Sequence, residues 1–206
     1  MHRKIAAVGD SHSLRCFENH AHIADSQAYF GYNKLDGKTA YKLNEHDRRV
    51  RKIITPIKDK HLIFSFGEVD VRIHIKLKHV QTGIPVKTLI SNTANRYTDY
   101  IVKLRNEGFD IHLFNIIPTG DFEGVEFENW KNNLVYPFTT SYAERQHYTL
   151  SLNNQYRKNC AVKRIPFIDI YDHLVDESGK RKEELIYDFS HLNSKTADIL
   201  LAHYTF

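Results

Sequence analysis

The chain has 206 residues, of which 41% are hydrophobic and 26% charged, with a formal net charge of +4. This length and composition predict one globular domain over residues 1–206. No apolar stretch is long enough to cross a bilayer, and the apolar part of the basic N-terminus is too short for a signal peptide, so no membrane partner is expected. Two cysteines, Cys16 and Cys160, make no disulfide framework, which favours a reducing, cytoplasmic location.

Short apolar strands alternate with amphipathic helices along the sequence. In chain order we expect a strand at residues 5–8, a helix at 13–20, a strand at 29–35, a helix at 44–54, a strand at 61–66, a helix at 89–106, a strand at 111–117, a helix at 141–160, a strand at 167–170 and a helix at 194–201. Gly108 is expected to close the helix before it, and Ser141 with Glu144 forms a capping box.

This alternation predicts a three-layer α/β/α sandwich with a mainly parallel central sheet. Sites in such sheets lie at the carboxyl ends of the strands. The regions of Ser11, Gly67 and Thr119 each follow a strand, so they are expected to meet on one edge.

The irregular stretch over residues 119–140 is too long for a simple connector. Its Trp130 and Tyr136 would offer flat faces for stacking on a sugar ring. The alternative interpretation is a small satellite core that pins this stretch to the body.

The densest basic patch, residues 48–52, is interpreted as the solvated face of a helix, with an anionic substrate or partner such as an acidic glycan as the alternative. No nucleic-acid-binding motif accompanies it, so no nucleic-acid partner is expected. None of the 13 histidines stands in a His-Glu-x-x-His spacing, and no Cys-x-x-Cys is present. No metal and no cofactor are therefore expected.

A serine and an Asp-x-x-His pair stand at opposite ends of the chain. Ser11 follows the first strand, where it would stand clear of the sheet at a helix N-terminus that favours developing negative charge. His191 would take its proton, and Asp188, three residues earlier, would hold the His191 ring in one tautomer. An N-cap role for Ser11, and a cap or surface role for Asp188, are the alternatives.

These motifs resemble the SGNH hydrolase superfamily, the GDSL-type esterases. Gly9-Asp10-Ser11-His12 is similar to its first block and Asp188-Phe189-Ser190-His191 to its last. The run at residues 35–40 stands where the second block places a glycine, Gly37. Residues 67–70 occupy the third block, which most often reads Gly-x-Asn-Asp. The order and spacing cover essentially the whole chain.

The resemblance implies an SGNH or flavodoxin-like fold and an ester hydrolase. Ser11 would be the nucleophile, His191 the base and Asp188 its orienting partner. The backbone N–H groups of Ser11 and Gly37 would form the oxyanion hole, where one donor contributes about 2.7–4 kcal/mol in a serine hydrolase.

The third block departs from the usual pattern because Val69 replaces the oxyanion asparagine. The run over residues 66–74 resembles a Gly-Glu-Ile-Asp-Cys-Arg subgroup that we associate with polysaccharide modification. It is also similar to the Gln-Gly-Glu-x-Asp of sialate O-acetylesterases, although Phe66 stands in place of the glutamine.

Several polar residues are candidates for supporting the site. Arg72 or His74 would supply the missing donor, whereas the alternative is a structural ion pair between Glu68 and Arg72. Asn115 is another possible donor, or it satisfies local backbone. The full set of supporting candidates is Asp10, His12, Glu68, Asp70, Arg72, His74 and Asn115. Either interpretation expects Glu68, Asp70 and Arg72 to be largely buried.

Three functions follow from these residues. The first is a serine esterase or acyltransferase acting on ester-linked acyl groups, preferably O-acetyl groups of a carbohydrate or polysaccharide. The second is a catalytically impaired module that binds a glycan or a protein partner, which the Val69 replacement motivates. The third is a metal-dependent phosphoesterase, because Asp10, His12, Asp188 and His191 are all metal-ligand types.

Overall fold

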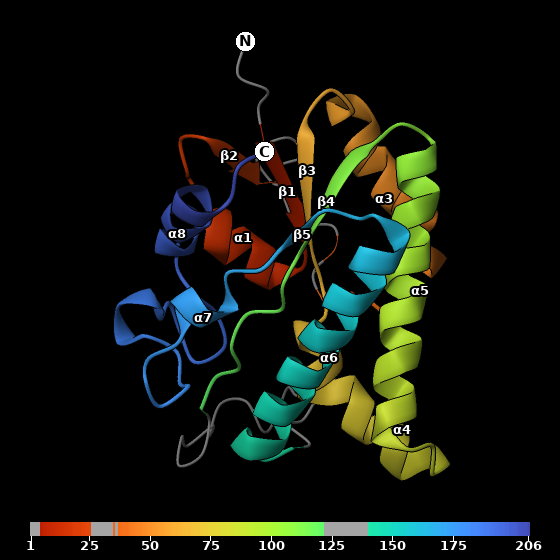
Figure 1. Cartoon of the computed structure of the whole chain (residues 1–206), viewed down its shortest axis with the longest axis vertical. Helices are drawn as coiled ribbons and strands as arrows, with labels where there is room; N and C mark the ends of the chain where they lie inside the picture. Colours follow the sequence, from red (N-terminus) through yellow and green to blue (C-terminus); the bar gives the residue numbers. More distant parts are fainter. Residues whose placement is uncertain (1–4, 26–34, 36, 122–139) are drawn as a thin grey trace.

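The computed structural model describes residues 5–25, 35, 37–121 and 140–206, and it contains a five-stranded parallel sheet (Figure 1). The strand order is β2-β1-β3-β4-β5. The strands are β1 (Ile5–Gly9), β2 (Ile23–Asp25), β3 (His61–Ser65), β4 (Asp110–Phe114) and β5 (Phe167–Ile168).

Helices cover both faces of the sheet, so the expected three layers are confirmed (Figure 1). One face carries α1 (Ser11–Phe17), α7 (Tyr171–Leu174) and α8 (Lys195–His203). The other carries α3 (Asp47–Ile54), α4 (Ile75–Thr82), α5 (Val86–Asn106) and α6 (Tyr142–Lys163). Short 3-10 turns span Leu43–His46, Thr55–Ile57 and Glu183–Leu185, and a π-helical turn spans Asp70–His74.

A hydrophobic core lies on each face of the sheet. Successive side chains of a strand point to opposite faces, so they enter different cores. On β1, Ala6 packs with the α3, α5 and α6 side, whereas Ala7 packs with the α1 and α8 side. On β3, Phe64 packs on the same side as Ala6, and Ile63 packs on the same side as Ala7. The sheet is therefore buried on both faces, which explains why its strands read as continuous apolar runs.

Most predicted elements are present, with shifted ends. The capping box of Ser141 and Glu144 is confirmed, since each side chain accepts the other residue's backbone N–H. The strand expected to reach residue 117 ends at Phe114, because beyond it the Ile116 N–H donates to the Asn153 side chain instead of a strand partner. The helix expected at 13–20 spans Ser11–Phe17 instead.

Other elements were not predicted or lie outside the described residues. The short edge strand β2 and the helical segment over residues 70–82 were not predicted, and the latter has no strong apolar periodicity. The strand predicted at 29–35 lies outside the described residues except for Leu35, which is buried in a turn.

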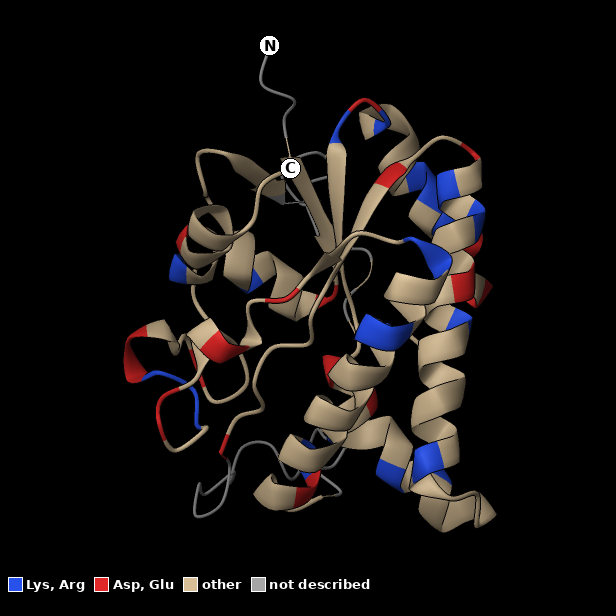
Figure 2. Cartoon of the chain, in the orientation of Figure 1, with Lys and Arg blue, Asp and Glu red and all other residues tan. Residues whose placement is uncertain are grey.

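Charged residues lie mainly outside the two cores, and Figure 2 shows many of the Lys and Arg residues on α5 and α6. In the basic patch, Arg48, Arg49 and Lys52 are exposed, and Arg51 forms ion pairs with Asp47 and Glu107. The patch is thus the solvated face of α3, as interpreted from the sequence. Within the described residues, no helix combines the length and apolar character that a membrane span requires.

Candidate active site

Ser11 is placed at the carboxyl end of β1 by a tight strand-to-helix turn. A Cβ on Gly9 would lie 2.4 Å from the Ser65 carbonyl oxygen, so this position requires glycine. Asp10 caps α1, because its Oδ1 accepts the His12 backbone N–H at 3.0 Å. Ser11 is therefore the first residue of the helix rather than its cap, and its hydroxyl is available for other partners.

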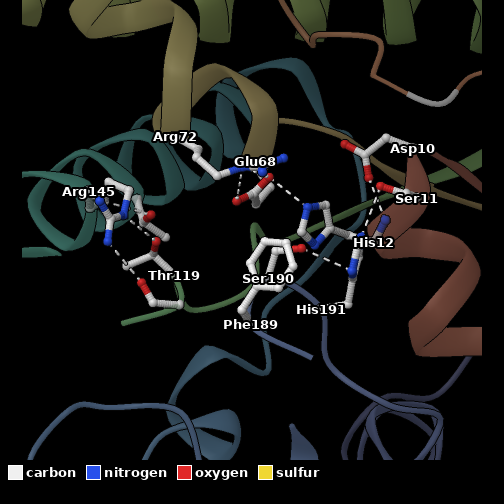
Figure 3. A network of polar contacts seen from close by, with 12 residues as sticks. Asp10, Ser11, His12, Glu68, Arg72, Thr119, Arg145, Phe189, Ser190 and His191 are labelled. Carbon is white, nitrogen blue, oxygen red and sulfur yellow. Dashed lines mark hydrogen bonds and ion pairs between the residues drawn. The ribbon is translucent and has the colours of Figure 1, made fainter. Parts of the chain in front are cut away.

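The two ends of the chain meet at this point (Figure 3). The Ser11 Oγ lies 3.1 Å from His191 Nε2, and His191 Nδ1 lies 2.9 Å from both carboxylate oxygens of Asp188. Asp188 Oδ1 also accepts the backbone N–H groups of Ser190 and His191, each at 2.8 Å. With a proton on Nδ1, Nε2 accepts from the serine hydroxyl, which is the geometry that a serine nucleophile needs.

Burial sets the ionisation of this group. It lowers the pKa of His191 to about 4, with neighbouring His12 acting in the same direction and Asp188 against it. Burial alone would raise the pKa of Asp188, but the hydrogen bonds from His191 and Ser190 hold it below its usual value. A neutral imidazole beside an ionised carboxylate is the resting state required for general-base action at neutral pH.

A second layer of buried polar side chains backs the histidine (Figure 3). The rings of His12 and His191 are 4.4 Å apart between centroids, and His12 Nε2 lies 2.6 Å from Glu68 Oε2. Arg72 Nε contacts the other Glu68 oxygen at 2.9 Å. Burial would raise the pKa of Glu68, but Arg72 and His12 lower it to about 2. The predicted ion pair between Glu68 and Arg72 is therefore present, and Glu68 is buried as expected.

Asp70 connects the third block to the second. Its side chain is buried and accepts the backbone N–H groups of Ala40 at 2.7 Å and Tyr41 at 3.2 Å. Burial raises its pKa to about 7, although these hydrogen bonds act against the rise. The carboxylate thereby fixes the segment that follows Gly37, which adopts a left-handed conformation with φ of +66°. The oxyanion role of Gly37 remains a prediction.

Three side chains, those of Arg72, His74 and Asn115, were candidates to replace the missing oxyanion donor, and the structure places each of them in different surroundings. Val69 is buried with no donor of its own, and Arg72 donates to Glu68. His74 lines a separate cavity. Asn115 satisfies local backbone, since it donates to the Ile116 carbonyl and accepts the Ile170 N–H.

The remaining predicted residues are Asp10, Trp130 and Tyr136, and one residue beside His191, Ser190, was not predicted. Asp10 is buried, and burial raises its pKa to about 6. Trp130 and Tyr136 lie outside the described residues. Sequence reasoning missed Ser190, whose Oγ lies 3.0 Å from His191 Nδ1. Its place between Asp188 and His191 is the signal that would have identified it.

A cavity of about 460 Å³ opens beside Gly37. Its basic lining residues are Lys38, Lys42, His46, His74 and Lys78. Glu45 and the buried Asp70 are its acidic ones, and Tyr41 and Thr39 add hydroxyl groups. Ser11 and His191 are not among its described lining residues. The cavity therefore adjoins the predicted oxyanion glycine rather than the nucleophile.

The parallel sheet, its flanking helices and the site at the strand ends define an SGNH-like α/β fold. No family model and no curated protein matches the sequence. Among solved structures, the chain is similar to a GDSL-like lipase from Bacteroides thetaiotaomicron, with 16% identity, a TM-score of 0.62 and coverage of 97% of this chain and 84% of that one.

Two further structures have the same fold. A lipase/acylhydrolase from Enterococcus faecalis has 18% identity, a TM-score of 0.54 and coverage of 98% and 92% of the two chains. An acetyl xylan esterase has 15% identity, a TM-score of 0.57 and coverage of 98% and 100%. Likeness at this level of identity establishes the fold, and the chemistry must be argued from the site.

Proposed function

We propose that the protein is a serine ester hydrolase of the SGNH type. The observation that carries this proposal is the continuous hydrogen-bonded series from Ser11 Oγ through His191 to Asp188. A serine hydroxyl, a neutral imidazole and a carboxylate in this order are the parts of a serine nucleophile that acts on acyl groups.

In the proposed reaction, Ser11 Oγ attacks the acyl carbonyl while His191 Nε2 takes the hydroxyl proton. The tetrahedral intermediate collapses when His191 returns that proton to the leaving alcohol, which leaves an acyl-serine. Water then attacks the acyl-serine, its proton passes to His191, and the acid departs as Ser11 regains its proton. Asp188 stabilises the imidazolium in both halves without taking the proton.

The developing oxyanion requires donors other than the side chain at position 69. We assign this task to the backbone N–H groups of Ser11 and Gly37. The Asp70 hydrogen bonds to Ala40 and Tyr41 support the assignment, because they anchor the chain just beyond Gly37. A site with one donor fewer is expected to be slower by roughly 100- to 1000-fold than one with a full set.

For the substrate, we propose an O-acetyl ester of a carbohydrate that carries a negative charge. The fold similarity to an acetyl xylan esterase supports the acetyl ester. The cavity beside Gly37, with Lys38, Lys42 and Lys78 in its lining, supports the negative charge. Transfer of the acyl group to a sugar hydroxyl instead of water uses the same acyl-serine, so product analysis with an added acceptor separates the two outcomes.

The buried Val69 side chain offers no oxyanion donor, and this favours a second candidate function. The protein would then be an SGNH-like module that binds a glycan or protein and hydrolyses esters poorly. Covalent labelling separates this candidate from the enzyme. A fluorophosphonate is expected to label the native protein and not Ser11→Ala. Ser13→Ala is the matched control, since Ser13 lies on the same helix but is buried.

The native protein and the Ser13 variant should also hydrolyse p-nitrophenyl acetate, with no loss of activity in EDTA, whereas Ser11→Ala should not hydrolyse it. Absence of both labelling and hydrolysis in the native protein would favour the binding module. Hydrolysis of p-nitrophenyl phosphate that EDTA abolishes, with no hydrolysis of p-nitrophenyl acetate, would favour a metal-dependent phosphoesterase.

A further inference from the structure

Two histidines and an aspartate meet at the start of the central strands. His61 begins β3 and pairs with Asp110, the first residue of β4, in the parallel register. His112 lies two residues after Asp110, so its side chain is on the same face of β4. The sheet register therefore directs all three side chains toward one point.

The distances among these side chains suit a shared ligand. His61 Nδ1 lies 2.7 Å from Asp110 Oδ2, and His112 Nε2 lies 3.3 Å from Asp110 Oδ1. One ligand atom from each residue lies within 4.8 Å of the others, and in the described part of the chain this is the one such group of three. Ligands about 2.0–2.2 Å from a tetrahedral zinc ion are separated by roughly 3.3–3.6 Å, so small side-chain rotations would accommodate one.

The surroundings of His112 orient it as a metal ligand. Its Nδ1 lies 2.9 Å from the Tyr204 hydroxyl, so a proton on Nδ1 would leave the Nε2 lone pair facing Asp110. Metal-bound histidines usually have such a partner on the second ring nitrogen. The ring of Phe206 packs against His61 and His112 with centroids 5.5 and 5.1 Å away, which shields one side of the group.

We propose that His61 Nδ1, Asp110 and His112 Nε2 form a binding site for zinc or a similar borderline divalent cation. An imidazole–carboxylate donor set favours such ions over magnesium or calcium. The Asp110 side chain is 35% exposed, which leaves room for water as a fourth ligand. Arg105 Nη1, 3.9 Å from Asp110 Oδ1, opposes the cation and limits its affinity.

The site is separate from the proposed esterase centre. Ile5 pairs with His61 and Gly9 with Ser65, so the metal group lies at the opposite end of the strands from Ser11. Four residues of strand separate the two ends, about 13 Å at roughly 3.3 Å per residue. The ion would join the start of β3 to the start of β4, and the C-terminal segment would contact the site through the Tyr204 hydrogen bond to His112 and the packing of Phe206. Its expected role is structural, and no motif in the sequence indicates it.

The test is metal binding by untagged protein that has been stripped with a chelator. Zinc titration by calorimetry is expected to show one saturable site, with a rise in melting temperature and, when Co²⁺ is used, the visible absorption of a tetrahedral complex. His61→Ala and His112→Ala should each weaken zinc binding at least tenfold. Tyr204→Phe, which removes only the hydroxyl, should weaken it less.

His20→Ala is the matched control, because His20 also lies against an aspartate, Asp198 at 3.1 Å, but belongs to no such group of three. This variant should bind zinc as the native protein does, and circular dichroism checks that every variant is folded. The proposal is overturned if zinc does not bind, or if folded His61→Ala binds it with unchanged affinity and stoichiometry. Neither result depends on esterase activity.

Discussion

The imidazoles of His12 and His191 lie in contact, with ring centroids 4.4 Å apart and their planes inclined by 37°. Only His191 reaches Ser11, whereas His12 Nε2 lies against the Glu68 carboxylate. The residue directly after the proposed nucleophile is thus part of a buried polar layer behind the proposed base. This arrangement links the first and third sequence blocks to the last one, and it makes the ionisation of His191 sensitive to its neighbour.

The first prediction concerns the pH dependence of hydrolysis. Because burial lowers the pKa of His191 to about 4, the base is protonated and inactive only below that value. We expect kcat/KM for p-nitrophenyl acetate to fall on the acid side with a midpoint near pH 4, rather than near the usual histidine value of about 6.5. An acid limb near the usual value would contradict the buried, neutral His191.

The second prediction concerns His12. Since His12 lowers the pKa of His191, His12→Asn should move the acid limb of kcat/KM to higher pH. His22→Asn is the control, because His22 is exposed and lies on the loop before β2. A purely structural role for His12 would change the amount of folded protein or kcat and leave the midpoint of the limb in place. A limb that does not move therefore refutes this coupling.

The third prediction concerns Asp188. Asp188→Asn keeps the size of the side chain but removes the charge that stabilises the His191 imidazolium and selects its tautomer. By analogy with other serine triads, kcat should fall by roughly 10⁴-fold, with little change in KM. Steady-state kinetics with p-nitrophenyl acetate would measure this. A loss of tenfold or less would mean that Asp188 serves mainly to hold the backbone of Ser190 and His191.

The fourth prediction concerns stability and pH. Burial raises the pKa of Asp70 from 3.8 to about 7 in the folded protein, so the folded state binds the proton more tightly than the unfolded chain. The contribution of Asp70 to stability is therefore fully present below about pH 4 and is lost as the pH rises toward 7. For one proton, the steepest loss is about 1.4 kcal/mol per pH unit.

Asp70→Asn cannot ionise and should lack this part of the pH dependence. Urea unfolding of both proteins between pH 4 and 8 gives the difference in unfolding free energy, in which the other titrating groups cancel to first order. As the pH rises, the unfolding free energy of the native protein should fall relative to that of the Asp70→Asn variant. A difference that is constant with pH would show that Asp70 titrates normally in the folded state.

The fifth prediction concerns Arg145 on α6. This arginine is 2% exposed, and it donates to the carbonyls of Gly120 and Thr140 and to the Thr119 hydroxyl. It therefore connects the two ends of the 119–140 stretch, residues 119–120 and residue 140. Arg145→Met leaves buried acceptors without this donor, at about 1–3 kcal/mol for each.

Chemical denaturation would measure the loss of unfolding free energy, and Arg157→Met supplies the control. Arg157 is on the same helix and pairs with Asp169, but it is 53% exposed. A solvent-exposed pair of this kind contributes about 0–1 kcal/mol. Equal losses in the two variants would show that the Arg145 contacts do not anchor this stretch.

The elements that sequence patterns predicted well are those whose burial is set by local composition. Continuous apolar runs identified β1, β3 and β4, and helical spacing with a capping signal identified α5 and α6. The edge strand β2 has only three residues, and its pairing with β1 is a tertiary contact that short segments do not encode. Helix α4 was missed for a similar reason, since Ile75 is its one fully buried residue.

Cys16 and Cys160, which suggested a reducing location, are both free and buried, and they belong to different cores. Their contribution is to packing, and burial raises the pKa of each thiol to about 12. The cytoplasmic location thus stays a prediction.

By itself, the sequence determined the α/β order of this protein and the residue types of a serine site, because apolar periodicity and short motifs are local properties. Only the tertiary structure brought Ser11 within 3.1 Å of His191, 180 positions away, and aligned His61 with Asp110 and His112. Strand register and helix packing over the whole sheet fix those distances, and no local pattern contains them. The same packing placed His12 Nε2 2.6 Å from Glu68 Oε2, where His12 and Arg72 lower the pKa of Glu68.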